Sequence, residues 1–135
     1  AEAVAAQNPG QYILAADTVV ACGRRVLPKA ESAAEVTSCL QLLSGRRHRV
    51  YGGICLIAPD GKARTKLAES IVKFRRLTAD EIAAYTASGE GLGKAGGYAI
   101  QGMAAAYIPF IAGSYSNIVG LDLAVVAQLI RSSRA

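Results

Sequence analysis

The chain has 135 residues and a formal net charge of +5, with 52% hydrophobic and 19% charged residues. This length suits one domain with a real core, and the hydrophobic content excludes a disordered chain. No apolar stretch approaches the roughly 20 residues that a membrane-spanning helix requires. The sequence therefore predicts a single globular domain over residues 1–135, and its positive charge favours an anionic partner.

The first residues predict the end of a helix. Residues 1–7 resemble last helical turns, closed by Asn8-Pro9-Gly10. Because a domain rarely begins within a helix, we expect an N-terminal piece to be missing. The segment has neither a basic start nor a long apolar stretch, which argues against a secretory signal and for the cytoplasm.

Tyr12 to Val20 is a nearly unbroken apolar run with one carboxylate, Asp17, set into it. Such a run predicts a strand that is buried on both faces. An ionised side chain there is costly unless it meets a cation, a metal or several donors, so Asp17 is a candidate for metal or phosphate chemistry. The alternative is that Asp17 caps a turn or pairs with a surface arginine.

A small hairpin is expected next, because Gly23 can turn the chain back into Val26-Leu27. This return would carry Lys29 towards the end of the strand where Asp17 lies. Lys29 is therefore a candidate partner for Asp17 or for a phosphate. Cys22, Cys39 and Cys55 lack Cys-x-x-Cys spacing, so neither a disulfide framework nor a zinc site is indicated.

The middle of the chain predicts two helices and a long hairpin. Ser32 to Glu35 and Thr78 to Glu81 each have the form of a capping box, followed by helices that end at Ser44-Gly45 and Ser88-Gly89. Between them, His48 to Ile57 and Ala63 to Leu77 read as two antiparallel strands joined by a turn at residues 59–62.

The last third predicts a glycine-dense loop, a strand and a helix. The loop covers residues 89–102, and Pro109 suggests an edge position or a bulge for a strand at residues 107–111. Asp122 would cap a final helix, with Leu121 and Val126 stapled across its start. Its buried stripe is expected to contain Leu123, Ala127 and Ile130. The whole pattern predicts an α/β fold, a mixed, twisted sheet with flanking helices.

The glycine loop formally matches two nucleotide-binding motifs, and both fail. The dinucleotide fingerprint needs a preceding strand, whereas a helix precedes Gly91 to Gly96. A P-loop fails because Ser88 replaces its first glycine and Ala95 its hydroxyl residue. What remains is a glycine-rich segment whose backbone N–H groups, together with Lys94, could approach an anion closely; the alternative is a surface turn.

Three further polar features each allow more than one interpretation. Gln101 can donate and accept, which suits the edge of a pyrimidine base, although a single glutamine is usually unremarkable. The basic run Arg46 to Arg49 could belong to a nucleic-acid patch, but stacking aromatics are sparse and strand alternation would scatter the charges. His48, the only histidine, lacks a nucleophile partner at motif spacing, so a structural role is favoured.

Several blocks together resemble one family, the Maf-like nucleoside triphosphate pyrophosphatases, also called septum formation inhibitors. They come in the family's order and cover nearly the whole chain. The matching blocks are Leu14 to Val20, Leu27-Pro28-Lys29, Leu43 to Tyr51, Ser88-Gly89-Glu90, Lys94 to Gly102 and Gly113 to Leu121.

The resemblance implies a Maf/ITPase-like fold and a divalent-metal-dependent hydrolysis of a nucleoside triphosphate between its α and β phosphates. It implies that Asp17 is the proton acceptor and a candidate metal ligand, with Mg²⁺ or Mn²⁺ as the metal. Thr18 and Gln101 resemble substrate-specificity positions, and Lys29 and Lys94 resemble phosphate-binding lysines. The form of the blocks is similar to the branch that acts on dTTP and UTP, and the family name implies a role in cell-division arrest.

The chain also departs from the family pattern. It lacks the Ser/Arg-rich phosphate loop that opens the family domain, so truncation is expected, and Ala30 and Gly52 stand where proline and threonine are usual. The missing loop supports an alternative, a non-catalytic nucleotide-binding division inhibitor. Neither nucleic acid nor a membrane is expected as a partner, and whether the chain forms a homodimer stays open.

Overall fold

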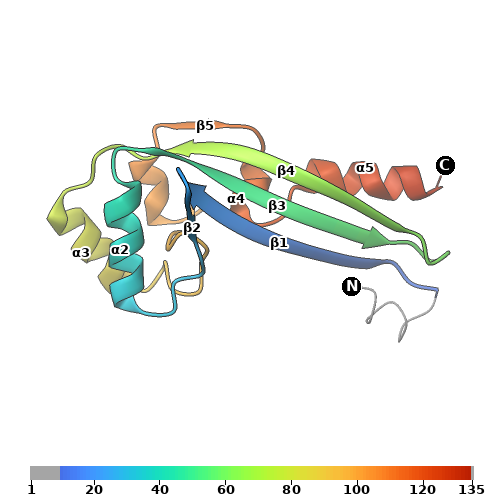
Figure 1. Ribbon diagram of the computed structural model, residues 1–135, viewed down its shortest axis with the longest axis horizontal. Coiled ribbons are helices and arrows are strands. Elements are labelled where there is room, and N and C mark those ends of the chain that lie inside the picture. The colour runs from blue at the N-terminus through green and yellow to red at the C-terminus, as the bar shows by residue number, and fades with distance from the viewer. Residues whose placement is uncertain (1–9, 135) are drawn as a thin grey trace.

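The computed structural model describes residues 10–134, and the expected helix end at residues 1–7 lies outside them. Its centre is one five-stranded sheet with the strand order β2-β1-β3-β4-β5 (Figure 1). Three strands are long and form most of the surface of the sheet. The strands are β1 (Ile13–Cys22), β2 (Arg25–Leu27), β3 (Arg47–Ile57), β4 (Ala63–Lys73) and β5 (Phe110–Ala112).

All strand pairings among the described residues are antiparallel, so the expectation of a mixed sheet is wrong for this part of the chain. The antiparallel pairing follows from the way in which the strands are connected. Short turns join β1 to β2 and β3 to β4, and such turns can link only antiparallel neighbours. Two connections contain helices: the one from β2 to β3 joins strands that lie on either side of β1 and do not pair, and the one from β4 to β5 joins neighbours that pair antiparallel. The α/β class itself is confirmed.

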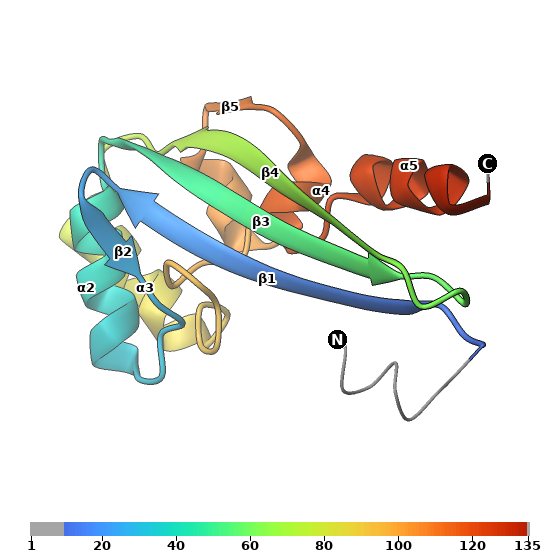
Figure 2. The same cartoon turned by 45° about the vertical axis from the view of Figure 1, so that its right-hand side comes forward.

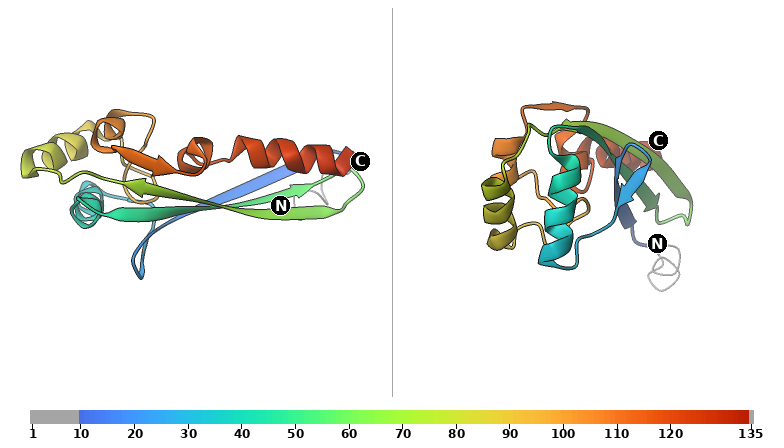
Figure 3. Two further views of the ribbon diagram at one scale, coloured as in Figure 1. Left: turned by 90° about the horizontal axis from the view of Figure 1, so that it is seen from above. Right: turned by 60° about the vertical axis from the view of Figure 1, so that its left-hand side comes forward.

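The helices lie on one side of the sheet. In Figure 1, α2 and α3 gather at one end of the long strands, and α5 runs along them at the other end. Figure 3 shows α5 on one side of the strands, with no other described element facing it across them. The helices are α2 (Ala33–Leu43), α3 (Ala79–Ser88), α4 (Tyr115–Val119) and α5 (Leu123–Arg134), and η1 (Met103–Tyr107) is a 3₁₀-helix.

Both predicted helix starts are observed. The Thr78 side chain accepts from Glu81 N–H while the Glu81 carboxylate accepts from Thr78 N–H, a complete capping box. Ser32 caps α2 by accepting from Glu35 N–H at 3.2 Å. The Glu35 carboxylate accepts from Glu31 N–H instead, so only half of that box forms. Both predicted hairpins are also confirmed, although β4 ends at Lys73, before the expected Leu77.

The strand that carries Asp17 is not buried on both faces, contrary to the sequence expectation. Leu14 is 42% and Val19 38% exposed, and only Val20 and Cys22 of β1 are buried. β3 shows the reason, because its side chains alternate between the helix-covered face and an outer face that no described helix covers. The sheet therefore has one covered face and one outer face over the described residues (Figure 2).

The core has two parts on the covered face. The larger lies beneath α2 and α3 and contains Leu40, Phe74 and Tyr85, all fully buried. The smaller lies beneath α5 and consists of Ile54, Leu56 and Leu129.

The buried stripe of α5 differs from the prediction. Leu123 is 62% exposed and Ala127 is also exposed, whereas Leu129 is buried and Ile130 partly so. Asp122 does cap the helix, since its Oδ1 accepts from Val125 N–H at 3.1 Å. The apolar residues of this segment allow two helical stripes, and the packing of Leu121 and Val126 against the smaller core selects the one that includes Leu129.

None of the helices between residues 10 and 134 is long and apolar enough to cross a membrane.

Candidate functional site

The glycine loop is fastened to the segment between β2 and α2. Gly93 N–H donates to Ala30 O at 2.8 Å, and Ala30 N–H donates to Lys94 O at 3.1 Å. Lys29 and Ala95 form an isolated antiparallel bridge next to these bonds, and Gly96 N–H donates to Pro28 O at 3.4 Å on its other side. The loop can follow this path because Gly96 and Gly97 adopt φ values of 74° and 75°, which are costly for other residues. The consequence is that Lys29 and Lys94 lie beside the same pocket.

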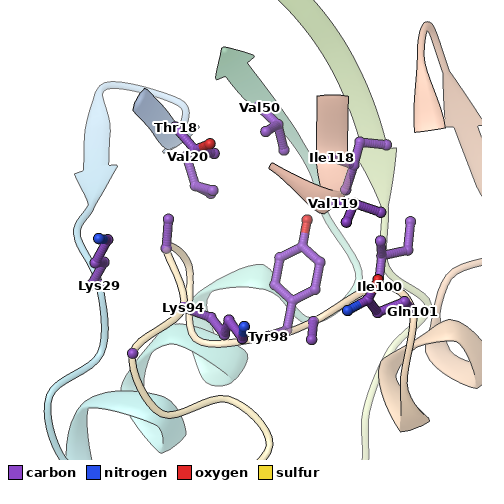
Figure 4. Close-up of a pocket in the computed structure, with 13 residues that line it drawn as sticks. Thr18, Val20, Lys29, Val50, Lys94, Tyr98, Ile100, Gln101, Ile118 and Val119 are labelled. Atoms are coloured by element: carbon purple, nitrogen blue, oxygen red, sulfur yellow. The ribbon is translucent and has the colours of Figure 1, made fainter. Parts of the chain in front are cut away.

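This pocket, which we call the lysine pocket, has a volume of about 150 Å³. In Figure 4, Thr18 and Val20 border it from β1, Lys29 lies at the left, Lys94 below, and Gln101 at the right. Its remaining wall is mostly apolar and comes from β3, α4 and the glycine loop. That wall includes Val50, Ile100, Ile118 and Val119.

The structure therefore brings together four of the five residues that the sequence predicted for a site. Thr18, Lys29, Lys94 and Gln101 come from three separate segments and line one pocket. The two lysines and Gln101 are exposed at its mouth, so both ammonium groups are accessible to an anion. The roles assigned to these residues remain predictions.

Asp17 does not line the lysine pocket. It follows the alternation of β1, so its exposed side chain faces away from Thr18, onto the outer face of the sheet. There it borders a shallow hollow of about 480 Å³ over Gly53, whose missing side chain leaves space beside Cys55. The expectation that the hairpin carries Lys29 to Asp17 is thus wrong, because the hairpin brings Lys29 to the side of Thr18.

Asp17 and Thr18 nevertheless lie at the same open edge. β2 pairs with β1 only at Val20 to Cys22, so in the described chain no strand pairs with residues 13–19 on that side. The Asp17 carboxylate accepts from Thr18 N–H at 3.0 Å, and Thr18 Oγ1 donates to Gly120 O at 3.4 Å. A ligand that extends around this edge can reach both faces of the strand.

Tyr98 is a pocket residue that the sequence analysis did not single out, although it lies in a quoted family block. Figure 4 shows its ring in the middle of the lysine pocket, with the hydroxyl towards Val50 and α4. That hydroxyl shares a hydrogen bond of 2.6 Å with His48 Nε2. Phe74 packs on both rings, with centroid distances of 5.0 Å to Tyr98 and 5.6 Å to His48.

His48 has the structural role that its isolation in the sequence indicated. It is 2% exposed, and burial lowers the pKa of its imidazole to about 4. Burial also raises the pKa of Tyr98. Both groups are therefore neutral near pH 7, and the pair fixes the back of the pocket without adding charge.

A second buried polar cluster supports α4, which supplies Ile118 and Val119 to the pocket. Asn117 Nδ2 donates to Val50 O at 3.1 Å and to Ser70 Oγ at 3.0 Å. A Cβ on Gly52 would overlap with Asn117 Oδ1. Glycine at position 52, where the family usually has threonine, thus leaves room for the buried amide.

Among residues 10–134, no group of three or more His, Cys, Asp or Glu side chains could hold a metal ion. Asp17 is the one carboxylate among the residues that line the hollow over Gly53, and Lys66 lines the same hollow. The residues present do not form a metal cage of their own.

Comparison with known proteins identifies the class. The Maf-like protein family matches residues 1–133. The chain therefore belongs to this family, and the resemblance drawn from its sequence blocks is confirmed.

Several similar curated proteins carry the name dTTP/UTP pyrophosphatase. The one from Paramagnetospirillum magneticum is 65% identical over 128 residues, which cover 95% of this chain and 67% of that protein. The one from Granulibacter bethesdensis is 63% identical over 120 residues, covering 89% and 56%. The one from Caulobacter vibrioides is 55% identical over 130 residues, covering 96% and 67%. The chain thus spans between 56% and 67% of the length of these relatives.

Proposed function

We propose that this chain is part of a nucleoside triphosphate pyrophosphatase that acts on dTTP and UTP. The observation that carries the proposal is the lysine pocket, where Lys29, Lys94, Thr18 and Gln101 converge from three segments. The names of relatives at 55–65% identity agree with it. The reaction would release the nucleoside monophosphate and pyrophosphate.

The chemistry of the pocket matches the two ends of a pyrimidine nucleotide. Two exposed ammonium groups beside glycine backbone suit phosphate oxygens, and Gln101 can both donate to and accept from the edge of uracil or thymine. The volume of about 150 Å³ is well below the roughly 300–1,000 Å³ of typical ligand pockets. The pocket therefore holds part of the nucleotide, and the rest extends along the open edge of β1.

Asp17 is proposed as the proton acceptor. Water attacks the α-phosphorus, the bridging bond to the β-phosphate breaks, pyrophosphate leaves with the electron pair, and the proton of the water passes to the carboxylate. Asp17 is exposed and next to Thr18 on β1, so a substrate that rounds the open edge brings its α-phosphate to the carboxylate. A base in this position typically contributes about 10²–10⁴ in rate.

We further propose that a divalent cation, Mg²⁺ or Mn²⁺, accompanies the triphosphate. Such ions are commonly bound by one or two carboxylates together with substrate phosphates, and Asp17 is the carboxylate at the edge of the pocket. When bound, the ion would neutralise charge on the phosphate oxygens.

The decisive experiment measures pyrophosphate release from dTTP, UTP, dCTP, dATP and dGTP with magnesium present. It compares wild type with Gln101→Ala, both for the chain and for a version extended by any residues encoded before Ala1. We expect Gln101→Ala to lose at least tenfold more activity with dTTP and UTP than with purine triphosphates, because a polar base edge loses its partner. Equal losses with all bases would contradict the proposed base recognition. Tight nucleotide binding without pyrophosphate release, even in the extended version, would instead support a non-catalytic nucleotide-binding protein.

A further inference from the structure

Gln101 lies on a turn that is held at both ends by one pair of side chains. The turn runs from Ala99 to Gly102 and is closed by Gly102 N–H, which donates to Ala99 O at 3.2 Å. Ile100, inside it, is buried in the larger core, whereas Gln101 projects to the exposed mouth of the lysine pocket. The direction of the Gln101 side chain therefore depends on how this turn is anchored.

The first anchor is Tyr85 on α3. Its ring is fully buried and its hydroxyl accepts from Ala99 N–H at 3.0 Å. The same hydroxyl donates to Glu90 Oε1 at 2.9 Å. Burial raises the pKa of Tyr85, so the hydroxyl stays protonated and keeps both bonds at neutral pH.

The second anchor is Glu90, which follows the left-handed Gly89 at the end of α3. Its Oε2 accepts from Met103 N–H at 3.1 Å, on the other side of Gln101. A Cβ on Gly102 would collide with this carboxylate, so glycine at position 102 is what allows the close approach. Glu90 is only partly exposed.

These contacts form a bracket, which we define as Tyr85 and Glu90 bound to Ala99 N–H and Met103 N–H. The bracket binds the backbone two residues before and two residues after Gln101. Neither Tyr85 nor Glu90 lines the lysine pocket. Both therefore act on the pocket through the position of Gln101.

We propose that Tyr85 and Glu90 are positioning residues that hold Gln101 in the orientation needed to select a pyrimidine base. This inference rests on the proposed function, and it adds specificity determinants that lie outside the pocket. Because hydrogen-bond recognition requires donors and acceptors in place to within a fraction of an ångström, a loosened turn should lose base selection before it loses phosphate binding.

The test compares Tyr85→Phe and Glu90→Gln with a matched control. Tyr85→Phe removes the acceptor of Ala99 N–H, and Glu90→Gln replaces one of the two accepting oxygens with a donor. The control is Thr86→Val, on the same helix, which removes the 2.9 Å hydrogen bond between Thr86 Oγ1 and Thr37 Oγ1 and leaves the bracket intact. A further variant, Gly102→Ala, displaces the carboxylate without removing it.

The readout is the ratio of kcat/KM for dTTP to kcat/KM for dATP. We expect this ratio to fall about tenfold in Tyr85→Phe, Glu90→Gln and Gly102→Ala, while kcat/KM for dATP stays nearly constant. The ratio should stay unchanged in Thr86→Val. In a Gln101→Ala background, Glu90→Gln should produce no further change in the ratio, because residues that act through one another are not additive.

The outcomes separate this inference from the proposed function. If wild type prefers dTTP and the bracket variants keep that preference, or if Thr86→Val loses it equally, the inference is wrong while the function stands. A further fall of the ratio on adding Glu90→Gln to Gln101→Ala would also overturn it. If wild type shows no preference between bases, the proposed base selection fails, and the positioning role fails with it.

Discussion

Asp17 and Thr18 are consecutive in β1, yet their side chains face opposite sides of the sheet, and both lie on the strand edge that β2 leaves unpaired. The residue proposed to accept a proton is thus separated by one strand from the pocket proposed to bind phosphate and base. A substrate must pass around the edge of β1 to use both. This geometry makes the role of Asp17 the first point to test.

Asp17→Asn is expected to lower kcat for dTTP by about 10²–10⁴, because the amide cannot accept the proton from water. The melting temperature should change little, since the carboxylate is exposed and forms no ion pair with another described residue. Glu69→Gln is the matched control. It neutralises a carboxylate on the same outer face, where Glu69 pairs with Arg49 at 3.3 Å, and should retain kcat. Near-normal pyrophosphate release from Asp17→Asn would remove Asp17 from the mechanism.

Lys29→Ala and Lys94→Ala are each expected to raise KM for dTTP about tenfold, because each variant loses one ammonium group that would contact the triphosphate. The increase in KM should become smaller as salt is added, because salt screens exposed charges. The screening length is about 8–10 Å at physiological ionic strength. Lys62→Ala, on the exposed β3–β4 turn away from the pocket, serves as control. Unchanged KM values for both pocket variants would show that the phosphates bind elsewhere.

The stability of the fold should depend on pH through His48. Its pKa is lowered from about 6.5 to about 4 by burial, so between these values the unfolded chain binds a proton that the folded chain does not. This contribution to the free energy of unfolding is therefore fully present well above pH 6.5 and declines as the pH falls towards 4, by about 3 kcal/mol in total. Urea unfolding at a series of pH values from 7.5 to 5 measures how steeply the free energy of unfolding changes with pH.

His48→Phe supplies the control for that measurement. The chain has a single histidine, so no other histidine contributes between pH 5 and 6.5. In this variant the pH dependence of the free energy of unfolding over that interval should largely disappear. The loss of the hydrogen bond to Tyr98 should lower the stability at every pH. A slope equal to that of wild type would assign the pH dependence to other groups.

Gly52→Ala is expected to destabilise the protein by about 1–3 kcal/mol, because the added methyl group overlaps with Asn117 Oδ1 and must displace a buried, hydrogen-bonded amide. The neighbouring Gly53→Ala provides the comparison. A Cβ at Gly53 meets nothing within 4 Å, so its effect on the free energy of unfolding should be small. Similar effects of the two substitutions would indicate that Asn117 moves aside freely.

Local features of the fold were predictable because they depend on neighbouring residues. Both helix caps follow from a hydroxyl and a carboxylate three residues apart, and both hairpins from short turns between apolar runs. β5 is an edge strand, one of the two alternatives that Pro109 suggested, but it covers Phe110–Ala112 and begins after the proline, whereas residues 107–111 were expected. The 3₁₀-helix η1 and the short helix α4 were not anticipated. Neither shows an apolar period long enough to be recognised.

The predictions that were wrong concern features that depend on contacts between distant segments. Leu123 was expected in the core and is exposed, because the smaller core beneath α5 selects a different helical stripe. The sheet was expected to be mixed, but one helical connection joins β2 and β3, which do not pair, and the other joins β4 and β5, which pair antiparallel. In both cases the sequence allows two arrangements with similar local energies, and packing decides between them.

By itself, the sequence determined the order of the main strands and helices, the starts of α2, α3 and α5, the family and the polar residues proposed for a site. Only the tertiary structure decided which of those residues meet. It joined Lys29 and Lys94 through backbone bonds between the glycine loop and the β2–α2 segment, and it placed Gln101 within the bracket of Tyr85 and Glu90. Alternation along β1 already put Asp17 and Thr18 on opposite faces, but which face the helices cover depends on long-range burial of apolar surface, and no local pattern encodes it.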